Sequence, residues 1–187
     1  EKGLIRLQQK PTIPDFTNIF SQKKPQPILQ LKKYGILALL TELDGELHFI
    51  LTKRAAHVRQ PGDICFPGGH QEKGEDLKQT ALRETEEELG IPIEQIRIMG
   101  KSNYMLTGYG GLIQPYIGIV SAQDYHSISC QLEEVAEVFT IPLAFFLEHP
   151  PEIHYMYWKA DMSVPVPYDR IENGKSYGFR ECKVPEL

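Results

Sequence analysis

The stretch Phe66–Ile91, "FPGGHQEKGEDLKQTALRETEEELGI", opens on a pair of glycines and closes on a cluster of glutamates. Four apolar residues recur at the spacing of one helix face: Leu77, Ala81, Leu82 and Leu89. Acidic residues at positions 75 and 76 suit the start of this helix, Gly90 suits its C-terminal cap, and Pro92 prevents its continuation. The stretch therefore predicts a short strand that ends in a tight turn, followed by one well-delimited helix.

The glutamates of this helix admit two interpretations. Glu84, Glu86, Glu87 and Glu88 crowd together with Arg83 as the nearby cation, and Glu84 stacks above Glu88 because residues four apart share a helix face. Like charges at this spacing repel by roughly 0.2–0.5 kcal/mol per pair. A solvated charged face is the usual explanation of such a run. A divalent cation is the alternative, and Mg²⁺ suits carboxylate oxygens while it leaves positions for phosphate.

The spacing of the stretch resembles the Nudix box. Gly69 is followed after five residues by Glu75 and after seven more by Arg83-Glu84, and Glu87-Glu88, Gly90 and Ile91 complete the pattern. The one departure is Thr85, which stands where an aliphatic residue is usual. So many fixed positions in one register favour the metal interpretation over the solvated face.

The resemblance implies an α/β fold, the Nudix-type α/β/α sandwich with a mixed central β-sheet. It also implies that Mg²⁺ or Mn²⁺ assists attack by water on a diphosphate. Matched to the box, Arg83, Glu87 and Glu88 are the expected catalytic residues. Metal coordination is expected from Glu84, Glu87 and Glu88, and Glu75 is expected to pair with Arg83. The general base stays open between the box and two later acids, Glu134 and Glu137, which also read as ordinary surface acids beside a strand.

The segment before the box bears on the substrate. "LTKRAAHVRQPGDICFPGG" resembles the motif of coenzyme A pyrophosphatases, although Gln60-Pro61 replaces a His that many of these enzymes carry. The substrate-binding residues implied by this resemblance are Lys53, Arg54, Arg59, Gly68 and Gly69. Arg offers bidentate contacts to phosphate. Loop solubility explains each of these cations equally well when it is taken alone.

The function expected from both motifs is hydrolysis of coenzyme A, or a derivative, to 3′-phospho-AMP and 4′-phosphopantetheine. The alternative within the family is a pyrophosphatase acting on ADP-ribose or another nucleotide sugar. An alternative of another class is a non-catalytic nucleotide sensor with the same fold. The complete set of glutamates argues against the sensor, because binding alone does not require all of them.

The remainder of the chain predicts one domain. "YGILALLTE" and "LHFILTKR" are β-rich runs around an Asp-Gly step, which is a strong hairpin signal. We expect further strands in "IRIMGKSNYML", "LIQPYIGIVS" and "EVFTI", and a short helix in "PLAFFLEH". Residues 1–33 are expected to pack on this domain as an extension, and residues 34–187 to form it. The coenzyme A subfamily usually has one further strand, which we expect to be missing after Leu187.

Composition limits the partners and the compartment. A net charge of -5 argues against general binding to nucleic acid, which needs surplus cations. The three cysteines lie far apart, which favours reduced thiols and a cytoplasmic protein. No apolar run is long enough to span a bilayer, and the first residues lack the apolar stretch of a signal peptide. A small-molecule substrate is therefore the expected partner.

Overall fold

A computed structural model describes residues 12–14, 17, 21, 31–108, 110–158, 170, 172–173 and 182–186. The chain divides into two units, Glu1–Leu31 and Lys32–Leu187, and the elements below belong to the second. The prediction that residues 1–33 pack on the domain falls almost entirely outside the described residues. None of the helices that the structure describes is long and apolar enough to cross a membrane.

The predicted hairpin is confirmed. Strand β1 (Lys32–Leu43) pairs antiparallel with β2 (Glu46–Arg54), and Leu43 lies opposite Glu46. Asp44 and Gly45 connect the strands with φ angles of 52° and 83°. These left-handed values match the two-residue hairpin turns that an Asp-Gly step favours.

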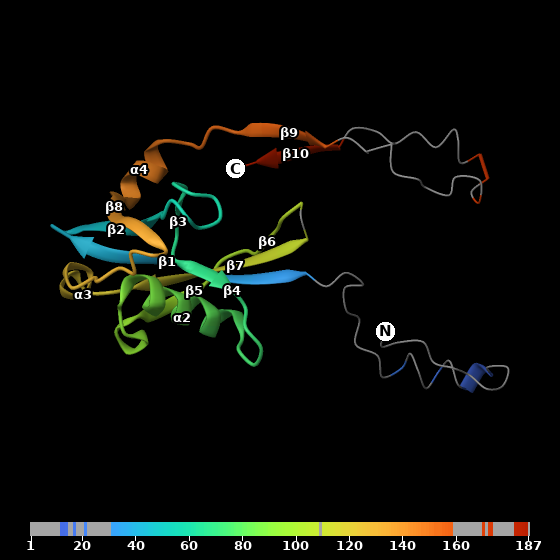
Figure 1. Cartoon of the computed structure of the whole chain (residues 1–187), viewed down its shortest axis with the longest axis horizontal. Coiled ribbons are helices and arrows are strands. Elements are labelled where there is room, and N and C mark those ends of the chain that lie inside the picture. The colour runs from blue at the N-terminus through green and yellow to red at the C-terminus, as the bar shows by residue number, and fades with distance from the viewer. Residues whose placement is uncertain are drawn as a thin grey trace. The chain divides into compact units, whose positions relative to one another are not determined.

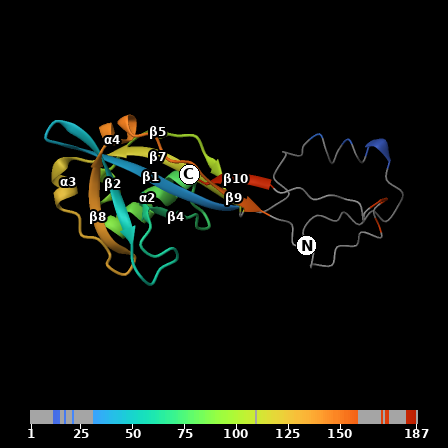
Figure 2. The same cartoon turned by 90° about the horizontal axis from the view of Figure 1, so that it is seen from above.

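The central sheet is mixed, as predicted. Its strands follow the order β3-β2-β1-β7-β5, while β4 also pairs with β1, β6 with β7 and β8 with β2 (Figures 1 and 2). The further strands are β3 (Ile64–Cys65), β4 (Gly68–His70), β5 (Arg97–Lys101), β6 (Met105–Leu106), β7 (Gly111–Ile119) and β8 (Val135–Pro142). Only β1 and β7 run parallel among these described pairs.

The predicted helix is α2 (Leu77–Leu89), and its caps explain its limits. The Asp76 side chain accepts hydrogen bonds from the backbone N–H groups of Lys78 and Gln79, both at 2.9 Å, and the Gln79 side chain accepts one from Asp76 N. Gly90 ends the helix in the left-handed conformation, with φ of 69°. Such a reciprocal capping box and glycine cap fix the helix at both ends.

The buried side of α2 differs from the predicted apolar face. Leu77 and Leu82 are only half-buried, whereas Thr80, Thr85 and Glu88 are buried beside Ala81 and Leu89. Thr85 is fully buried, and its hydroxyl donates to Ala81 O at 2.7 Å. The hydroxyl is thus satisfied within the helix, which explains how Thr replaces the aliphatic residue of the family pattern.

Helices lie on both faces of the sheet, so the expected α/β/α sandwich is confirmed. On one face, α2 covers the core formed by Leu37, Leu39 and Ile50, and Tyr125 of α3 (Ala122–His126) packs against the same core. On the other face, Phe146 of α4 (Leu143–Glu148) meets Phe49 edge to face at 5.5 Å. Figure 1 shows α2 and α4 on opposite sides of the sheet.

Two local predictions were wrong. The segment "IRIMGKSNYML" is two strands, β5 and β6, which are interrupted at residues 102–104. At this interruption the Gln114 side chain donates to Ser102 O at 2.8 Å, in the place of a backbone N–H group. The glycine pair is not a tight turn. It is part of β4, with Gly68 opposite Ile36 and Gly69 opposite Gly35.

Two elements were not predicted, the short helix α3 and the 3-10 turn η1 (Ile93–Gln95). Strands β9 (His154–Trp158) and β10 (Cys182–Glu186) form a separate two-stranded antiparallel sheet.

Candidate active site

The two glycines of β4 place backbone directly against the helix carboxylates. A Cβ on Gly69 would collide with the Glu84 carboxylate, and a Cβ on Gly68 would collide with Gly35 O and Ile36 Cα. Gly68 also has a φ of 147°, which side-chain-bearing residues rarely adopt. The chain therefore requires glycine at both positions to bring β4 this close to β1 and α2.

Gly35 is a structural requirement of the site that the sequence analysis missed. A Cβ on Gly35 would overlap Leu77 O and approach Thr80 Cβ at 3.0 Å, so the backbone of α2 lies directly on β1 there. The available signal was a single glycine inside an otherwise apolar strand, which often marks close backbone approach. Gly35 and Gly69 are also opposite each other in register, so β1, β4 and α2 approach one another closely at this point.

Arg83 links three acidic side chains. Its guanidinium donates to Glu75 Oε1 and Oε2, both at 3.1 Å, to Glu84 Oε1 at 2.9 Å and to Glu87 Oε2 at 2.9 Å. It also reaches His70 O at 3.3 Å. The expected pairing of Glu75 with Arg83 is confirmed. Charge-assisted bonds of this kind hold Glu84 and Glu87 in defined positions.

The Glu75 carboxylate is stabilised in its charged form. The hydrogen bonds from Arg83 lower the pKa of Glu75 from 4.5 to about 2, against an opposing effect of burial. Its Oε1 also accepts from Glu72 N and Thr80 Oγ1, both at 2.8 Å. The acidic start of the box is therefore a charged anchor for Arg83.

Glu75→Gln is expected to destabilise the fold by up to about 3 kcal/mol at neutral pH, since each pKa unit corresponds to about 1.4 kcal/mol. Because the folded pKa is depressed, this contribution is complete above pH 4.5 and is lost as the pH falls towards 2. Denaturant unfolding at a series of pH values measures it. The neighbouring exposed Glu72→Gln is the matched control, and equal losses in the two variants would contradict the role of Glu75.

Glu88 has a buried carboxyl group with few hydrogen bonds to offset the cost of its burial. It is 5% exposed, and its one hydrogen bond in the described structure comes from Gly68 N at 3.3 Å. Burial raises the pKa of Glu88 to about 8, and the nearby Glu84 and Glu134 add to this effect. Burial likewise raises the pKa of Glu84, despite the bond from Arg83. The arrangement thus disfavours the ionised form of both carboxyl groups as long as no cation lies beside them.

These carboxylates have the chemistry of a site for Mg²⁺ or Mn²⁺. Their oxygens are the ligands that Mg²⁺ prefers, and a cation would remove the unfavourable burial of charge at Glu88. Within the described ranges, no three His, Cys, Asp or Glu side chains are already gathered around one point. Arg83 instead holds Glu84 and Glu87, and Glu87 is largely exposed. The residues that would hold the ion are therefore Glu84 and Glu88, with Glu87 at the exposed edge.

Of the predicted cations, Arg54 is the one that the structure connects to the carboxylates. The charge of Arg54 lowers the pKa of Glu88, which places its guanidinium within electrostatic reach of that group. Its Nε donates to Arg59 O at 2.8 Å, and Gly62 N donates to Arg54 O at 3.1 Å. Arg54 therefore also fixes the loop between β2 and β3. The Arg59 side chain on this loop is exposed.

The remaining predicted cation, Lys53, lies on β2. Of the two later acids, Glu137 lies on β8 and Glu134 comes directly before it. Lys53 is exposed and lies opposite Glu137 in strand register, away from the box. Glu134 raises the pKa of both Glu84 and Glu88, so its carboxylate lies near them. Its backbone is fixed by bonds from Ala55 N and to Gln131 O. The charge of Glu134 is thus part of the electrostatic environment of both box glutamates.

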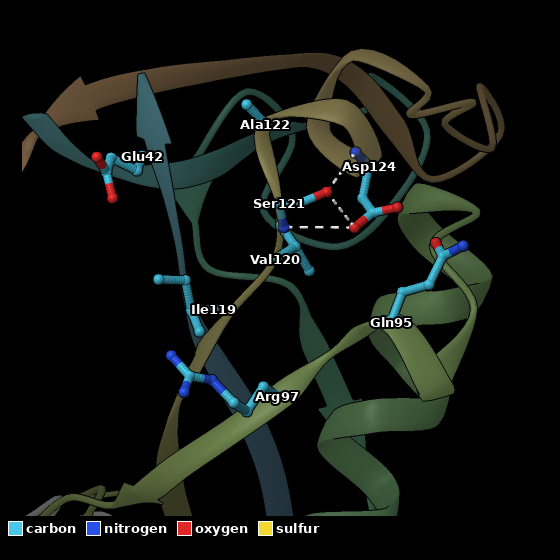
Figure 3. Close-up of a pocket in the computed structure, with 8 residues that line it drawn as sticks. All are labelled: Glu42, Gln95, Arg97, Ile119, Val120, Ser121, Ala122 and Asp124. Atoms are coloured by element: carbon cyan, nitrogen blue, oxygen red, sulfur yellow. Dashed lines mark hydrogen bonds between the residues drawn. The ribbon is translucent and has the colours of Figure 1, made fainter. Parts of the chain in front are cut away.

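A hollow of about 440 Å³ lies elsewhere and contains none of the predicted site residues. It is lined by Glu42, Gln95, Arg97, Ile119, Val120, Ser121, Ala122 and Asp124 (Figure 3). Glu42 is seven residues along β1 from Gly35, which is roughly 23 Å in an extended strand. The hollow is open, and its Asp124 carboxylate is occupied by Ser121 at the start of α3. The candidate active site is therefore the region between β4 and α2.

Sequence comparisons match most of this unit. A family model described as NUDIX domain matches residues 31–153. The chain is 34% identical over 152 residues to a protein of Enterobacter sp. (strain 638) named "Uncharacterized Nudix hydrolase NudL", covering 76% of this chain and 77% of that protein. It is 32% identical over 131 residues to "Peroxisomal coenzyme A diphosphatase NUDT7" of Mus musculus, covering 68% of this chain and 53% of that protein.

Solved structures support the fold. A Caenorhabditis elegans Ap4A hydrolase, crystallised as a binary complex, superposes with a TM-score of 0.53 at 22% identity, over 62% of this chain and 83% of that one. This likeness shows the fold alone. The chain spans about half the length of two of the curated relatives that it matches.

Proposed function

Because this chain belongs to the Nudix family, we propose that it is a metal-dependent hydrolase that cleaves the diphosphate of coenzyme A or its derivatives. The products are 3′-phospho-AMP and 4′-phosphopantetheine. Water supplies the oxygen that bonds to one phosphorus, and the bridging bond of the diphosphate breaks. A bound Mg²⁺ or Mn²⁺ activates the water and neutralises the charge of the diphosphate.

The residues of the chain divide this work. The metal would be held by Glu84, Glu87 and Glu88. The catalytic centre consists of Glu87, Glu88 and Arg83. Arg83 keeps Glu84 and Glu87 oriented through its hydrogen bonds. Gly68 and Gly69 let the diphosphate approach the backbone of β4, because neither residue has a side chain. Glu134 accepts the proton from the attacking water.

The observation that supports coenzyme A is the link between Arg54 and the box. Arg54 lies within electrostatic reach of Glu88 and at the same time fixes the loop that carries Arg59. A substrate with a diphosphate and a second, separate phosphate needs one cation near the box for the diphosphate and another on the loop for the separate phosphate. The substrate named for the mouse relative has this composition, and ADP-ribose does not.

A comparison of kcat/KM for coenzyme A and ADP-ribose, each with Mg²⁺ and with Mn²⁺, tests the substrate. We expect faster turnover of coenzyme A. Faster hydrolysis of ADP-ribose would favour the alternative pyrophosphatase, and tight binding of a nucleotide without any turnover would favour a sensor.

Arg59→Gln is expected to raise the KM for coenzyme A about tenfold, the equivalent of one lost charge-assisted contact of about 1.4 kcal/mol. The KM for dephospho-coenzyme A, which lacks the 3′-phosphate, should stay within about twofold. Steady-state kinetics with both substrates measure the difference. Arg97→Gln, at an exposed arginine on β5, is the charge-matched control. Equal effects on both substrates would show that Arg59 does not bind the 3′-phosphate.

We also propose that residues 34–187 form one catalytic domain and that the protein acts in the cytoplasm. Cys65 and Cys130 are free thiols, which suits a reducing compartment. Imaging of the tagged full-length protein tests the location, and accumulation in an organelle would contradict it.

A further inference from the structure

Four strands contribute one residue each to a row that starts beside the glycine pair. His70 of β4 pairs with Tyr34 of β1, Tyr34 with Ile113 of β7, and Ile113 with Met105 of β6. Residues paired across neighbouring strands project to the same face of a sheet. The rings of Tyr34 and His70 meet edge to face at 5.4 Å. At a strand spacing of about 4.8 Å, the row extends roughly 14 Å from the active site.

The row lies on the face of the sheet that is turned away from α2. Gly35 lies against α2, so its neighbour Tyr34 projects to the other face. The helix on that face, α4, makes its main contacts with β2 and β8, on the other side of β1 from β7 and β6. His70 is exposed, Tyr34 and Ile113 are half-buried, and Met105 is 47% exposed. A ligand can therefore reach these side chains.

Charge is distributed unequally on the two sides of β4. The strand pairs with β1, and β3, which ends the loop that follows β2, comes just before it in the chain. Arg54 and Arg59 belong to the loop side, whereas the row on the β1 side contains aromatic and aliphatic side chains. The exposed Lys32 lies on the same face as Tyr34, two residues along β1. A ligand centred on the glycine pair would meet two arginines in one direction and a largely apolar row, with Lys32 at its edge, in the other.

We propose that the row from His70 to Met105 binds the uncharged pantetheine arm of the substrate, while the phosphorylated nucleoside lies towards Arg59. The proposal rests on the proposed function and adds the orientation of the substrate to it. The pantetheine arm consists of methylene, dimethyl and amide groups without charge, so it suits this surface. A sugar in its place would bury hydroxyl groups against apolar side chains without hydrogen-bond partners.

Product inhibition of Met105→Asp and Leu106→Asp tests the proposal. The two residues are adjacent on β6 and exposed to 47% and 60%, but they project to opposite faces. In Met105→Asp we expect inhibition by 4′-phosphopantetheine to weaken about tenfold, or ~1.4 kcal/mol, while inhibition by 3′-phospho-AMP is unchanged. In Leu106→Asp both inhibition constants should equal those of the unmodified protein.

Equal effects of the two variants, or equal weakening of both products by Met105→Asp, would overturn the proposal. Met105→Ser is the milder substitution if the melting temperature shows that the Asp variant disrupts the sheet. Calorimetric titration with 4′-phosphopantetheine tests binding by the row independently of the proposed hydrolysis, because it requires no turnover. If coenzyme A is not hydrolysed, the proposed function fails. If 4′-phosphopantetheine binds equally well to the unmodified protein and to Met105→Asp, the proposed binding of the pantetheine arm by the row is contradicted.

Discussion

Glu88→Gln is expected to lower kcat for diphosphate hydrolysis on the order of 10³-fold. The carboxylate lies between α2 and the β4 backbone, where it would hold the metal together with Glu84. Loss of Lewis-acid assistance removes several kcal/mol of transition-state stabilisation. Each 1.4 kcal/mol is about tenfold in rate. Steady-state kinetics at saturating Mg²⁺ measure this loss.

The same substitution is expected to leave the metal-free fold intact or more stable. Glu88 is 5% exposed, and Gln has nearly the same shape without a charge that must be buried. Its melting temperature without metal should therefore equal or exceed that of the unmodified protein. Metal titration should show weaker binding at the same time. Together these results would distinguish a lost ligand from a damaged fold.

Glu86→Gln is the matched control for Glu88→Gln. Glu86 is on the same helix but exposed, and its Oε1 accepts a bond from Ile93 N at 3.2 Å, which Gln can also accept. We expect unchanged kinetics and metal binding in this variant. If both variants lose activity equally, the effect is one of total charge, and the specific role of Glu88 is contradicted.

Gly35→Ala is expected to produce the largest loss of stability from a single methyl group. The new Cβ would overlap Leu77 O in the backbone of α2, which cannot rotate away as a side chain can. Overpacking of this kind typically costs about 1–3 kcal/mol. For a chain of this size, this lowers the melting temperature by on the order of 5–10 °C. Thermal unfolding followed by circular dichroism measures the change.

Gly100→Ala is the control for Gly35→Ala. Gly100 is also on a strand, and a Cβ built there meets no atom within 4 Å. Its melting temperature should change little. Activity should fall in Gly35→Ala even below its melting temperature, because the helix that carries Glu84 and Glu88 must shift. An unchanged melting temperature in Gly35→Ala would show that the helix does not pack on β1 this closely.

The hairpin and the limits of α2 were predictable from the residues because local signals fix them, whereas the sandwich was predicted from the resemblance to the Nudix box. An Asp-Gly step, an Asp before the helix and a Gly after it act through the backbone of a few neighbouring residues. The spacing from Gly69 to Ile91 also identified the acidic residues of the candidate site. These features need no knowledge of distant contacts.

Tertiary contacts decided the features that were missed. The local sequence of the glycine pair is typical of a turn, but pairing with β1 makes it part of the sheet. Gly35 is unremarkable in sequence until α2 is placed on it. The burial of Glu88 opposes its polarity and follows from tertiary contacts: α2 packs on the sheet, and the backbone N–H groups of Ser129 and Gln131 bond to the carbonyl groups of Leu89 and Glu88. Contacts between residues distant in sequence therefore bury these glutamates and raise the pKa values of Glu84 and Glu88.

The most direct test is to identify by mass the products that form when coenzyme A is incubated with the protein and Mg²⁺ or Mn²⁺. The predicted result is equal amounts of 3′-phospho-AMP and 4′-phosphopantetheine, one water incorporated per turnover, and no products after chelation of the metal or in Glu88→Gln. Intact coenzyme A in every sample, or product formation that persists undiminished in Glu88→Gln, would contradict the proposal that the box carboxylates catalyse cleavage of this diphosphate.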